Sequence, residues 1–322
     1  MDFLPILAQT IPVFLVMGVG FACQRMGLIN DDLEKGIMRL VLNVLLPCFI
    51  LWKVPGNPAL QSSGVVVSAL GWGMGITAIS FAICFGAGKL IGLSKETGVA
   101  TFAVAVGLQN YGFIPISLIE GIFMKDTALP MLGVLFVHNL GVEIVLWTLG
   151  VMLISGQHQG AWKNLISGPV IAILLGLTLN FSGGHEHIPW VVKEGIAKLG
   201  VCSIPISLML VGASLGGVVA REGLELDWKI MSSSCLLRFG LLPLLFVAAA
   251  LWVGPEGYLQ RLLLIQAAMP SAVFPIVLAK FFGGKPRVAV IVALTTSVIS
   301  LLVTPFLLTV LFGFFGIEIE QN

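Results

Sequence analysis

Residues 107–116 read GLQNYGFIPI and interrupt a segment that is otherwise apolar enough to cross a membrane. The stretch holds two glycines, a proline and three consecutive side chains that need hydrogen-bond partners. Pro115 lacks a backbone N–H and disfavours helical geometry at the residue before it, and Gly112 leaves helical geometry at little cost. The sequence therefore predicts a helix that ends near Gln109 or Asn110, crosses a few extended residues and restarts near Pro115.

The composition of the chain defines the class of protein that contains this interruption. Of 322 residues, 57% are hydrophobic and only 10% are charged. Soluble domains are about 25% charged, so this chain is predicted to be an all-α polytopic membrane protein. A net charge of +1 gives no basic patch for nucleic acid. Catalytic, phosphate-binding and metal-binding motifs do not occur, so we expect neither an enzyme nor a metal or other cofactor.

Ten segments are long and apolar enough to be membrane spans, for which roughly 20 residues are required. They cover residues 5–23, 37–54, 64–87, 98–119, 128–154, 165–182, 195–219, 229–253, 259–282 and 287–315. The loops after odd-numbered spans and the adjoining helix ends hold eleven Lys and Arg residues, against five for the even-numbered loops. Because positively charged loops stay in the cytoplasm, both termini are expected outside.

The fourth span has a counterpart in the ninth. Residues 267–276 read AAMPSAVFPI, and a shift of 160 positions aligns Pro115 with Pro275. Proline pairs in spans 1 and 6 and in spans 2 and 7 share nearly the same offset. Five spans is an odd number, so the second half enters the membrane from the opposite face. The sequence thus predicts two inverted five-helix repeats, residues 1–154 and 165–315, an arrangement typical of secondary transporters.

Each interrupted span is expected to restart as a half-helix in mid-membrane. Its N-terminus carries unpaired N–H groups and a partial positive charge, so two such ends that meet would bind an anion. The alternative is that the prolines only kink the helices and shape their packing. The predicted substrate-binding residues are Asn110, Tyr111, Gly112, Pro115, Asn139, Gln266, Met269, Pro270, Ser271 and Pro275.

Three ionisable residues at depth are candidates for ion coupling, because charges inside a bilayer are costly. They are His138 and Glu143 in the fifth span and Arg238 in the eighth. Asn139 and Glu143 are four residues apart and share a helix face that would meet the interruption. The alternatives are that Glu143 forms a structural pair with Arg238, or that Arg238 snorkels to the interface. Weaker candidate residues are Asn43, Thr295 and Thr296.

Several motifs together make the chain resemble the auxin efflux carrier family, in its bacterial permease branch, which includes malonate and malate carriers. These motifs are LVLNVLLPCFIL (40–51), GLQNYGFIPI (107–116), ISGPVIAILLGL (166–177), SIPISLMLVGASLGG (203–217), LRFGLLPLL (237–245) and AAMPSAVFPIVLAKFFGG (267–284). The resemblance covers nearly the whole chain.

The resemblance implies a fold similar to the bile-acid sodium symporters, with ten helices in two inverted halves and the fourth and ninth broken and crossed. Spans 1, 2, 6 and 7 would form a scaffold and the homodimer surface. Spans 3–5 and 8–10 would form a transport domain that moves substrate by an elevator-like shift. The bacterial branch implies the inner membrane. Asn110 matches the second asparagine of the plant motif Asn-Pro-Asn-Thr-Tyr, from which this chain otherwise departs.

The leading hypothesis is a secondary active transporter of small organic anions, such as malonate or malate, within a lipid bilayer. Auxin is not the expected substrate, because the long loop between spans 5 and 6 of the plant members is replaced here by a short one. One alternative is a cation-coupled exchanger in which Glu143 and His138 carry H⁺ or Na⁺. Another is a membrane sensor that moves no solute.

Overall fold

The computed structural model of the chain describes residues 3–156, 166–222, 227–254 and 257–318. The fold is helical, and within these ranges there is no strand beyond one isolated bridge. Helices occupy most of each of the ten ranges predicted to be spans. Lys163, which entered the loop count, and both ends of the chain lie outside the described residues, so the expected orientation stays a prediction.

The helices follow the chain in two successive sets. The first set is α1 (Phe3–Arg25), α2 (Asp31–Leu40), η1 (Val41–Leu45), α3 (Leu46–Lys53), η2 (Pro58–Gln61), α4 (Ser63–Leu90), α5 (Val99–Gly107), α6 (Phe113–Ile122), α7 (Lys125–Val145), η3 (Leu146–Gly150) and α8 (Val151–Ser155). The second set is α9 (Gly168–Ser182), η5 (Gly184–His187), α10 (Trp190–Val201), α11 (Ser203–Glu222), α12 (Trp228–Leu236), η6 (Leu237–Leu241), α13 (Leu242–Val253), α14 (Tyr258–Ala267), α15 (Phe274–Phe281) and α16 (Pro286–Phe315). The elements η1, η3 and η6 are π-helical turns inside otherwise continuous helices, a feature that often marks functional positions.

Seven helical segments in the described part of the chain are long and apolar enough to cross a membrane. They are Phe3–Arg25, Asp31–Lys53, Ser63–Leu90, Lys125–Ser155, Trp190–Ala220, Trp228–Val253 and Pro286–Phe315. The other three predicted spans are the short α9 and the two interrupted segments. The class of an all-helical polytopic membrane protein is therefore confirmed, whereas ten crossings and the inversion of the halves stay predictions.

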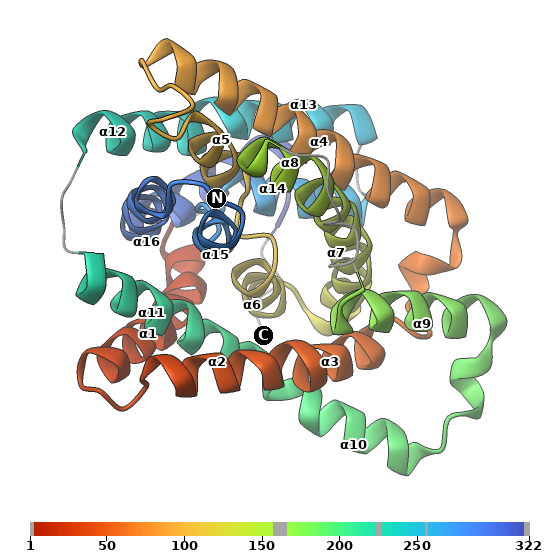
Figure 1. The fold of residues 1–322 in the computed structure, drawn as a ribbon. Helices are drawn as coiled ribbons and strands as arrows, with labels where there is room; N and C mark the ends of the chain where they lie inside the picture. The colour runs from red at the N-terminus through yellow and green to blue at the C-terminus, as the bar shows by residue number, and fades with distance from the viewer. Residues whose placement is uncertain (1–2, 157–165, 223–226, 255–256, 319–322) are drawn as a thin grey trace.

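The interrupted segments lie inside the bundle. Figure 1 shows α5, α6, α14 and α15 near the middle, with long helices around them. Eight of the nine residues of α5 and eight of the ten residues of α14 are buried. Backbone that leaves helical geometry at membrane depth is tolerated only where protein or water satisfies it. The interior position of the breaks meets that requirement.

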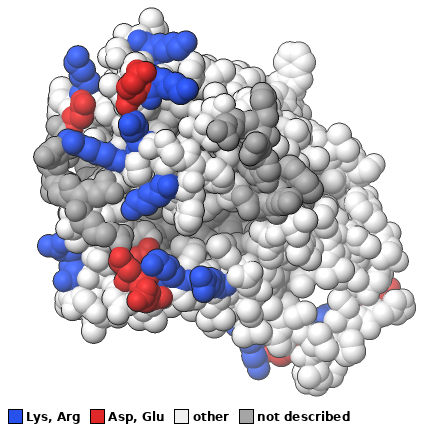
Figure 2. All heavy atoms as spheres, in the orientation of Figure 1, with Lys and Arg blue, Asp and Glu red and all other residues white. Residues whose placement is uncertain are grey.

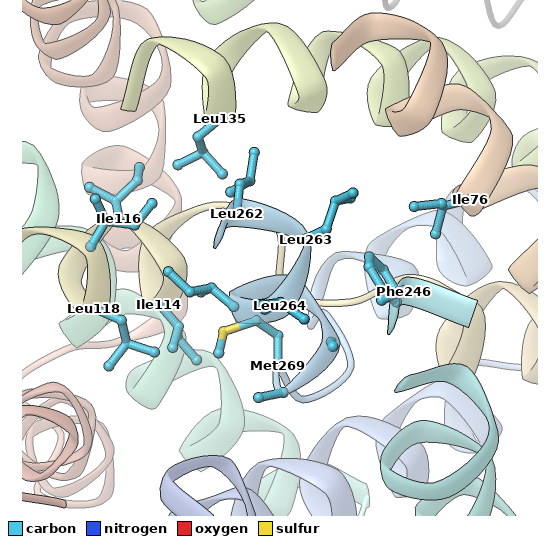
Figure 3. Packing of buried hydrophobic residues seen from close by; sticks show 14 of the residues in the cluster. Ile76, Ile114, Ile116, Leu118, Leu135, Phe246, Leu262, Leu263, Leu264 and Met269 are labelled. Atoms are coloured by element: carbon cyan, nitrogen blue, oxygen red, sulfur yellow. The ribbon is translucent and has the colours of Figure 1, made fainter. Parts of the chain in front are cut away.

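Hydrophobic packing fixes α14 at this interior position. Its Leu262, Leu263 and Leu264 are fully buried. Figure 3 shows them between side chains of α6 and α7 on one side and Ile76 of α4 and Phe246 of α13 on the other. Figure 2 shows that charged residues gather mainly on one side of the face in view, while the rest of that face is largely uncharged.

Glycines bring α4 and α7 into backbone contact. A Cβ atom added to Gly73 would lie 2.1 Å from the carbonyl oxygen of His138, and one added to Gly141 would lie 2.3 Å from that of Leu70. Small residues at such points let membrane helices approach closely. This contact fixes the position of α7, which carries Asn139 and Glu143.

Candidate functional site at the crossed helix breaks

Both predicted interruptions are present in the structure. Helix α5 ends at Gly107 and α6 begins at Phe113, while α14 ends at Ala267 and α15 begins at Phe274. Helix α6 thus begins two residues before Pro115, the predicted restart. A proline fits there because the first N–H groups of a helix have no partner within the helix anyway.

The two breaks are joined to one another by main-chain hydrogen bonds. The N–H of Asn110 donates to the carbonyl of Pro270 at 2.7 Å, and the N–H of Ala272 donates to the carbonyl of Leu108 at 2.9 Å. Between these bonds, Gln109 and Ser271 form an antiparallel bridge. Each break therefore satisfies backbone groups that the other has released from helical bonding.

Tyr111 connects the two halves of the chain through its carbonyl oxygen. This oxygen accepts hydrogen bonds from Nδ2 of Asn139 at 2.9 Å and from Nε2 of Gln266 at 3.3 Å. Asn139 belongs to the same half as Tyr111, and Gln266 lies in the last turn of α14 in the other half. Two amides from different halves thus hold one carbonyl in place.

Glu143 meets the first break through the same tyrosine. The hydroxyl of Tyr111 donates to Oε1 of Glu143 at 2.6 Å, and Nε1 of Trp147 donates to Oε2 at 2.8 Å. The prediction that Asn139 and Glu143 share a face directed at the break is therefore confirmed. The alternative that Glu143 pairs structurally with Arg238 is wrong, because neither side chain takes part in an ion pair between described residues.

The second break is bound by hydroxyl groups of α16. The N–H of Ser271 donates to Oγ1 of Thr296 at 3.2 Å, and Oγ1 of Thr304 donates to the carbonyl of Ala268 at 2.8 Å. Both threonines are fully buried. The long helix that follows each break therefore holds that break in place, α7 in the first half and α16 in the second.

Several buried polar atoms at the crossing have no hydrogen-bond partner among the described residues. These atoms are Oε1 and Nε2 of Gln109, Oγ of Ser271 and Oε1 of Gln266. The side chain of Asn110 likewise makes no hydrogen bond within the described part of the chain, and the residue keeps 8% of its surface exposed. Leaving such groups unpaired in a dry interior is unfavourable, so the crossing has unused capacity to bind a polar ligand.

The helix ends add an electrostatic component to the site. Helices α6 and α15 begin at the crossing and direct their N-termini toward it. Gly112 precedes α6, and a Cβ added there would meet no other heavy atom within 4 Å. Pro115, Met269 and Pro275 contribute buried apolar surface. Two helix N-termini and uncharged side-chain donors thus lie beside the open space at Gly112, where a ligand could approach the backbone closely.

The two other ionisable candidates are fully buried. Arg238 lies in η6, where its Nη2 donates to the carbonyl of Gln266 at 3.3 Å and its guanidinium lies 5.8 Å from the ring of Phe246. The alternative that Arg238 snorkels to the membrane interface is therefore wrong. Nδ1 of His138 lies 3.5 Å from Oδ1 of Asn139, and His138 forms no hydrogen bond or ion pair with Glu143 among the described residues.

Two weaker candidates do not reach the crossing. Asn43 is exposed and its Nδ2 donates to the carbonyl of Arg39 at 2.8 Å, within its own helix. Thr295 is half-buried and makes no hydrogen bond to the crossing among the described residues. Sequence reasoning missed Trp147 as a partner of Glu143, although their four-residue spacing on one helix face would have indicated it.

A family model described as membrane transport protein matches residues 5–163 and 158–308. The chain is 22% identical over 305 residues to an uncharacterized transporter of Methanocaldococcus jannaschii, and the aligned region covers 90% of this chain and 94% of that protein. It is 31% identical over 135 residues to auxin efflux carrier component 8 of Arabidopsis thaliana, covering 40% and 35%. It is 30% identical over 127 residues to probable auxin efflux carrier component 3b of Oryza sativa subsp. japonica, covering 38% and 21%. The matches span only a minor part of each plant relative.

Proposed function

Because this chain belongs to the membrane transport protein family and is similar to auxin efflux carriers, we propose that it is a secondary active transporter of small organic anions. The proposed substrates are mono- or dicarboxylates such as malonate or malate. The observation that carries this proposal is the pair of interrupted helices whose breaks are hydrogen-bonded to each other inside the bundle.

An anion is favoured because of the kind of groups that remain free at the crossing. The N-termini of α6 and α15 attract negative charge, and the amides of Gln109 and Asn110 can donate hydrogen bonds to it. Among the described residues, the acidic side chain bound at the crossing is that of Glu143, and each of its oxygens already accepts a hydrogen bond, from Tyr111 or from Trp147. A carboxylate matches this set of donors better than a cation does.

Packing between helices supports an elevator-type mechanism for the proposed transport. Helix α1 packs on α11, and α3 packs on α9 and α10. A second group forms around the breaks, in which α4 packs on α5 and α7, α13 on α14, and α12 on α16. We propose that the first group is the scaffold and that the second moves across the membrane with the substrate. The proposed setting is the bacterial inner membrane, with both termini outside and a homodimer formed through the scaffold.

Flux of labelled malonate or malate into proteoliposomes tests this function. The wild-type protein is expected to take up at least one of these acids, and Asn110→Ala is expected to reduce uptake strongly because it removes a free amide at the crossing. Gln61→Ala, which truncates an exposed amide outside the crossing, serves as the matched control. If Asn110→Ala transported every accepted acid normally, the assignment of the site would be wrong.

Cation-coupled exchange is a second candidate, and the position of Glu143 favours it. Its carboxyl group binds Tyr111 directly, so a change in its protonation or in its bound ion would be felt at the break. Glu143→Gln is then expected to abolish the dependence of uptake on pH or sodium while leaving the fold intact. Unchanged pH and sodium profiles in this variant would reject a coupling role for Glu143.

A further inference from the structure

Arg238 is a buried cation whose hydrogen-bonding capacity is largely unused. It is fully buried, and a guanidinium has five N–H donors. Its single hydrogen bond runs from Nη2 to the carbonyl of Gln266, whereas Nε and Nη1 have no partner among the described residues. Within the described part of the chain, no carboxylate oxygen lies within ion-pair distance of it. A charge in this condition is unfavourable unless an anion compensates for it.

The hydrogen bond from Arg238 to Gln266 does not explain why a cation is present. The carbonyl of Gln266 already accepts the N–H of Met269 at 3.3 Å, so its acceptor is satisfied without the guanidinium. In the first half of the chain, the residue beside the end of the corresponding half-helix α5 is Ser80. A Cβ added to Gly107, the last residue of α5, would be 3.1 Å from the carbonyl carbon of Ser80, so Ser80 lies beside a half-helix end as Arg238 does.

This comparison separates a structural role from a binding role. Helix α5 ends beside Ser80, a buried neutral hydroxyl group that has no partner among the described residues, and needs no cation there. A half-helix end of this kind can therefore form without an arginine. The positive charge of Arg238 is therefore a feature that distinguishes the second half from the first.

The free part of the guanidinium has the right shape for a carboxylate. Whichever hydrogen of Nη2 binds Gln266, one edge of the planar group keeps two parallel donors, the arrangement that binds a carboxylate bidentately. Gln266 joins this group to the crossing, because its carbonyl accepts from Arg238 and its Nε2 donates to the carbonyl of Tyr111. The cation and the crossed breaks therefore belong to one continuous polar region.

We propose that Arg238 binds one carboxylate of the substrate while the N-termini of α6 and α15 bind a second, so that the transported class is dicarboxylates. This inference rests on the proposed transport of organic anions and specifies its substrate class. Arg238 is the fixed charge that discriminates a diacid from its monoamide, because an amide cannot accept two parallel hydrogen bonds from the guanidinium. The amides of the crossing recognise the other end of the molecule.

Binding measurements on the purified full chain in lipid nanodiscs test the proposal. Calorimetry compares malonate, succinate and malate with their monoamides, for the wild type, Arg238→Gln and Arg238→Lys. Arg39→Gln removes the same charge from an exposed helix position and serves as the matched control. The wild type and the control are expected to prefer a diacid over its monoamide by about tenfold or more. Arg238→Gln is expected to lose that preference, and Arg238→Lys to keep only part of it because an ammonium cannot bind bidentately.

The possible results separate this inference from the function on which it rests. If Arg238→Gln retained the wild-type preference for the diacid, the assignment of Arg238 would be overturned while anion transport stood. If the wild type bound and transported none of these acids, the proposed function itself would fail. If Arg238→Gln did not fold, Arg238→Lys would decide, since an unchanged preference for the diacid in that variant contradicts bidentate binding.

Discussion

The two helix breaks resemble each other in their main chain and differ in their side chains. Both are extended segments between half-helices, and each donates an N–H group to the other. The first break is fastened through Tyr111, whose hydroxyl and carbonyl bind Glu143 and Asn139. The second break is fastened through its backbone, by the hydroxyls of Thr296 and Thr304.

This difference divides the chemistry of the site between the halves. The first half supplies several amides and a carboxyl group at the crossing, and the second half supplies hydroxyls, the single amide of Gln266 and the buried cation Arg238. The two breaks thus share one backbone geometry, while their different side chains make the two sides of the site chemically different. Substitutions at the two breaks should consequently lower stability or transport, by amounts that depend on the contact that is changed.

The largest effect is expected where the first break tolerates no side chain. A Cβ on Gly107 would lie 2.8 Å from Cδ1 of Phe81, which is fully buried, and 3.1 Å from the backbone carbonyl carbon of Ser80. The second half carries Ala267 at the corresponding position, 160 residues later, where α14 ends as α5 ends at Gly107. Gly107→Val is expected to lower the free energy of unfolding by about 3 kcal/mol, through overpacking. Unfolding in mixed detergent micelles measures this.

The control for this change lies in the same part of the bundle. Gly86 in α4 is exposed, and a Cβ added there would meet no other heavy atom within 4 Å. Gly86→Val introduces the same side chain without a clash, so its stability is expected to stay close to that of the wild type. Equal losses in the two variants would show that tight packing against Phe81 is not what distinguishes the first break.

A smaller effect is expected from removing the side-chain link of the first break. Tyr111→Phe deletes the hydroxyl that donates to Oε1 of Glu143 and leaves that oxygen without this donor. The expected loss is about 1.5 kcal/mol in the free energy of unfolding. A double-mutant cycle with Glu143→Gln should show coupling, because the two residues share one hydrogen bond. Additive losses would mean that the 2.6 Å contact contributes nothing measurable to stability.

The corresponding change at the second break is expected to be milder still. Thr296→Val removes an acceptor for the N–H of Ser271, at 3.2 Å, and preserves the volume of the side chain closely. Hydrogen bonds between membrane helices average about 0.6 kcal/mol, and this bond joins neutral groups. The variant should therefore lose less stability than Tyr111→Phe in the same unfolding assay. A larger loss would reverse the comparison and make the second break the more strongly fastened one.

The sequence predicted the breaks because proline and glycine act locally on the backbone. Pro115 and Pro275 fixed the positions within two or three residues, and helical periodicity correctly placed Asn139 and Glu143 on one face. Gln109 was not among the predicted binding residues, because side-chain direction in an extended crossing follows no helical period. Its burial without a partner depends on packing between segments about 160 residues apart.

Arg238 is a second residue whose contacts could not be predicted from the sequence. Its sequence position indicates depth in the membrane, yet whether it faces Glu143, the lipid interface or the end of α14 depends on how η6 packs. Asn43 is the opposite case, since an amide predicted to be at depth can simply bond to the preceding turn of its own helix. Periodicity within one helix cannot distinguish these outcomes.

The smallest effect is expected at Asn43, which lies outside both breaks. Its amide donates to the carbonyl of Arg39 and its side chain is exposed, so Asn43→Ala removes one local hydrogen bond and gains helix propensity. We expect a change of less than about 0.5 kcal/mol in stability and carboxylate uptake within about twofold of the wild type. Uptake that fell as far as in Asn110→Ala, with stability unchanged, would mean that the binding site extends to η1. The contrast between the two breaks would then describe only part of the site, because a residue from the proposed scaffold would contribute to it as well.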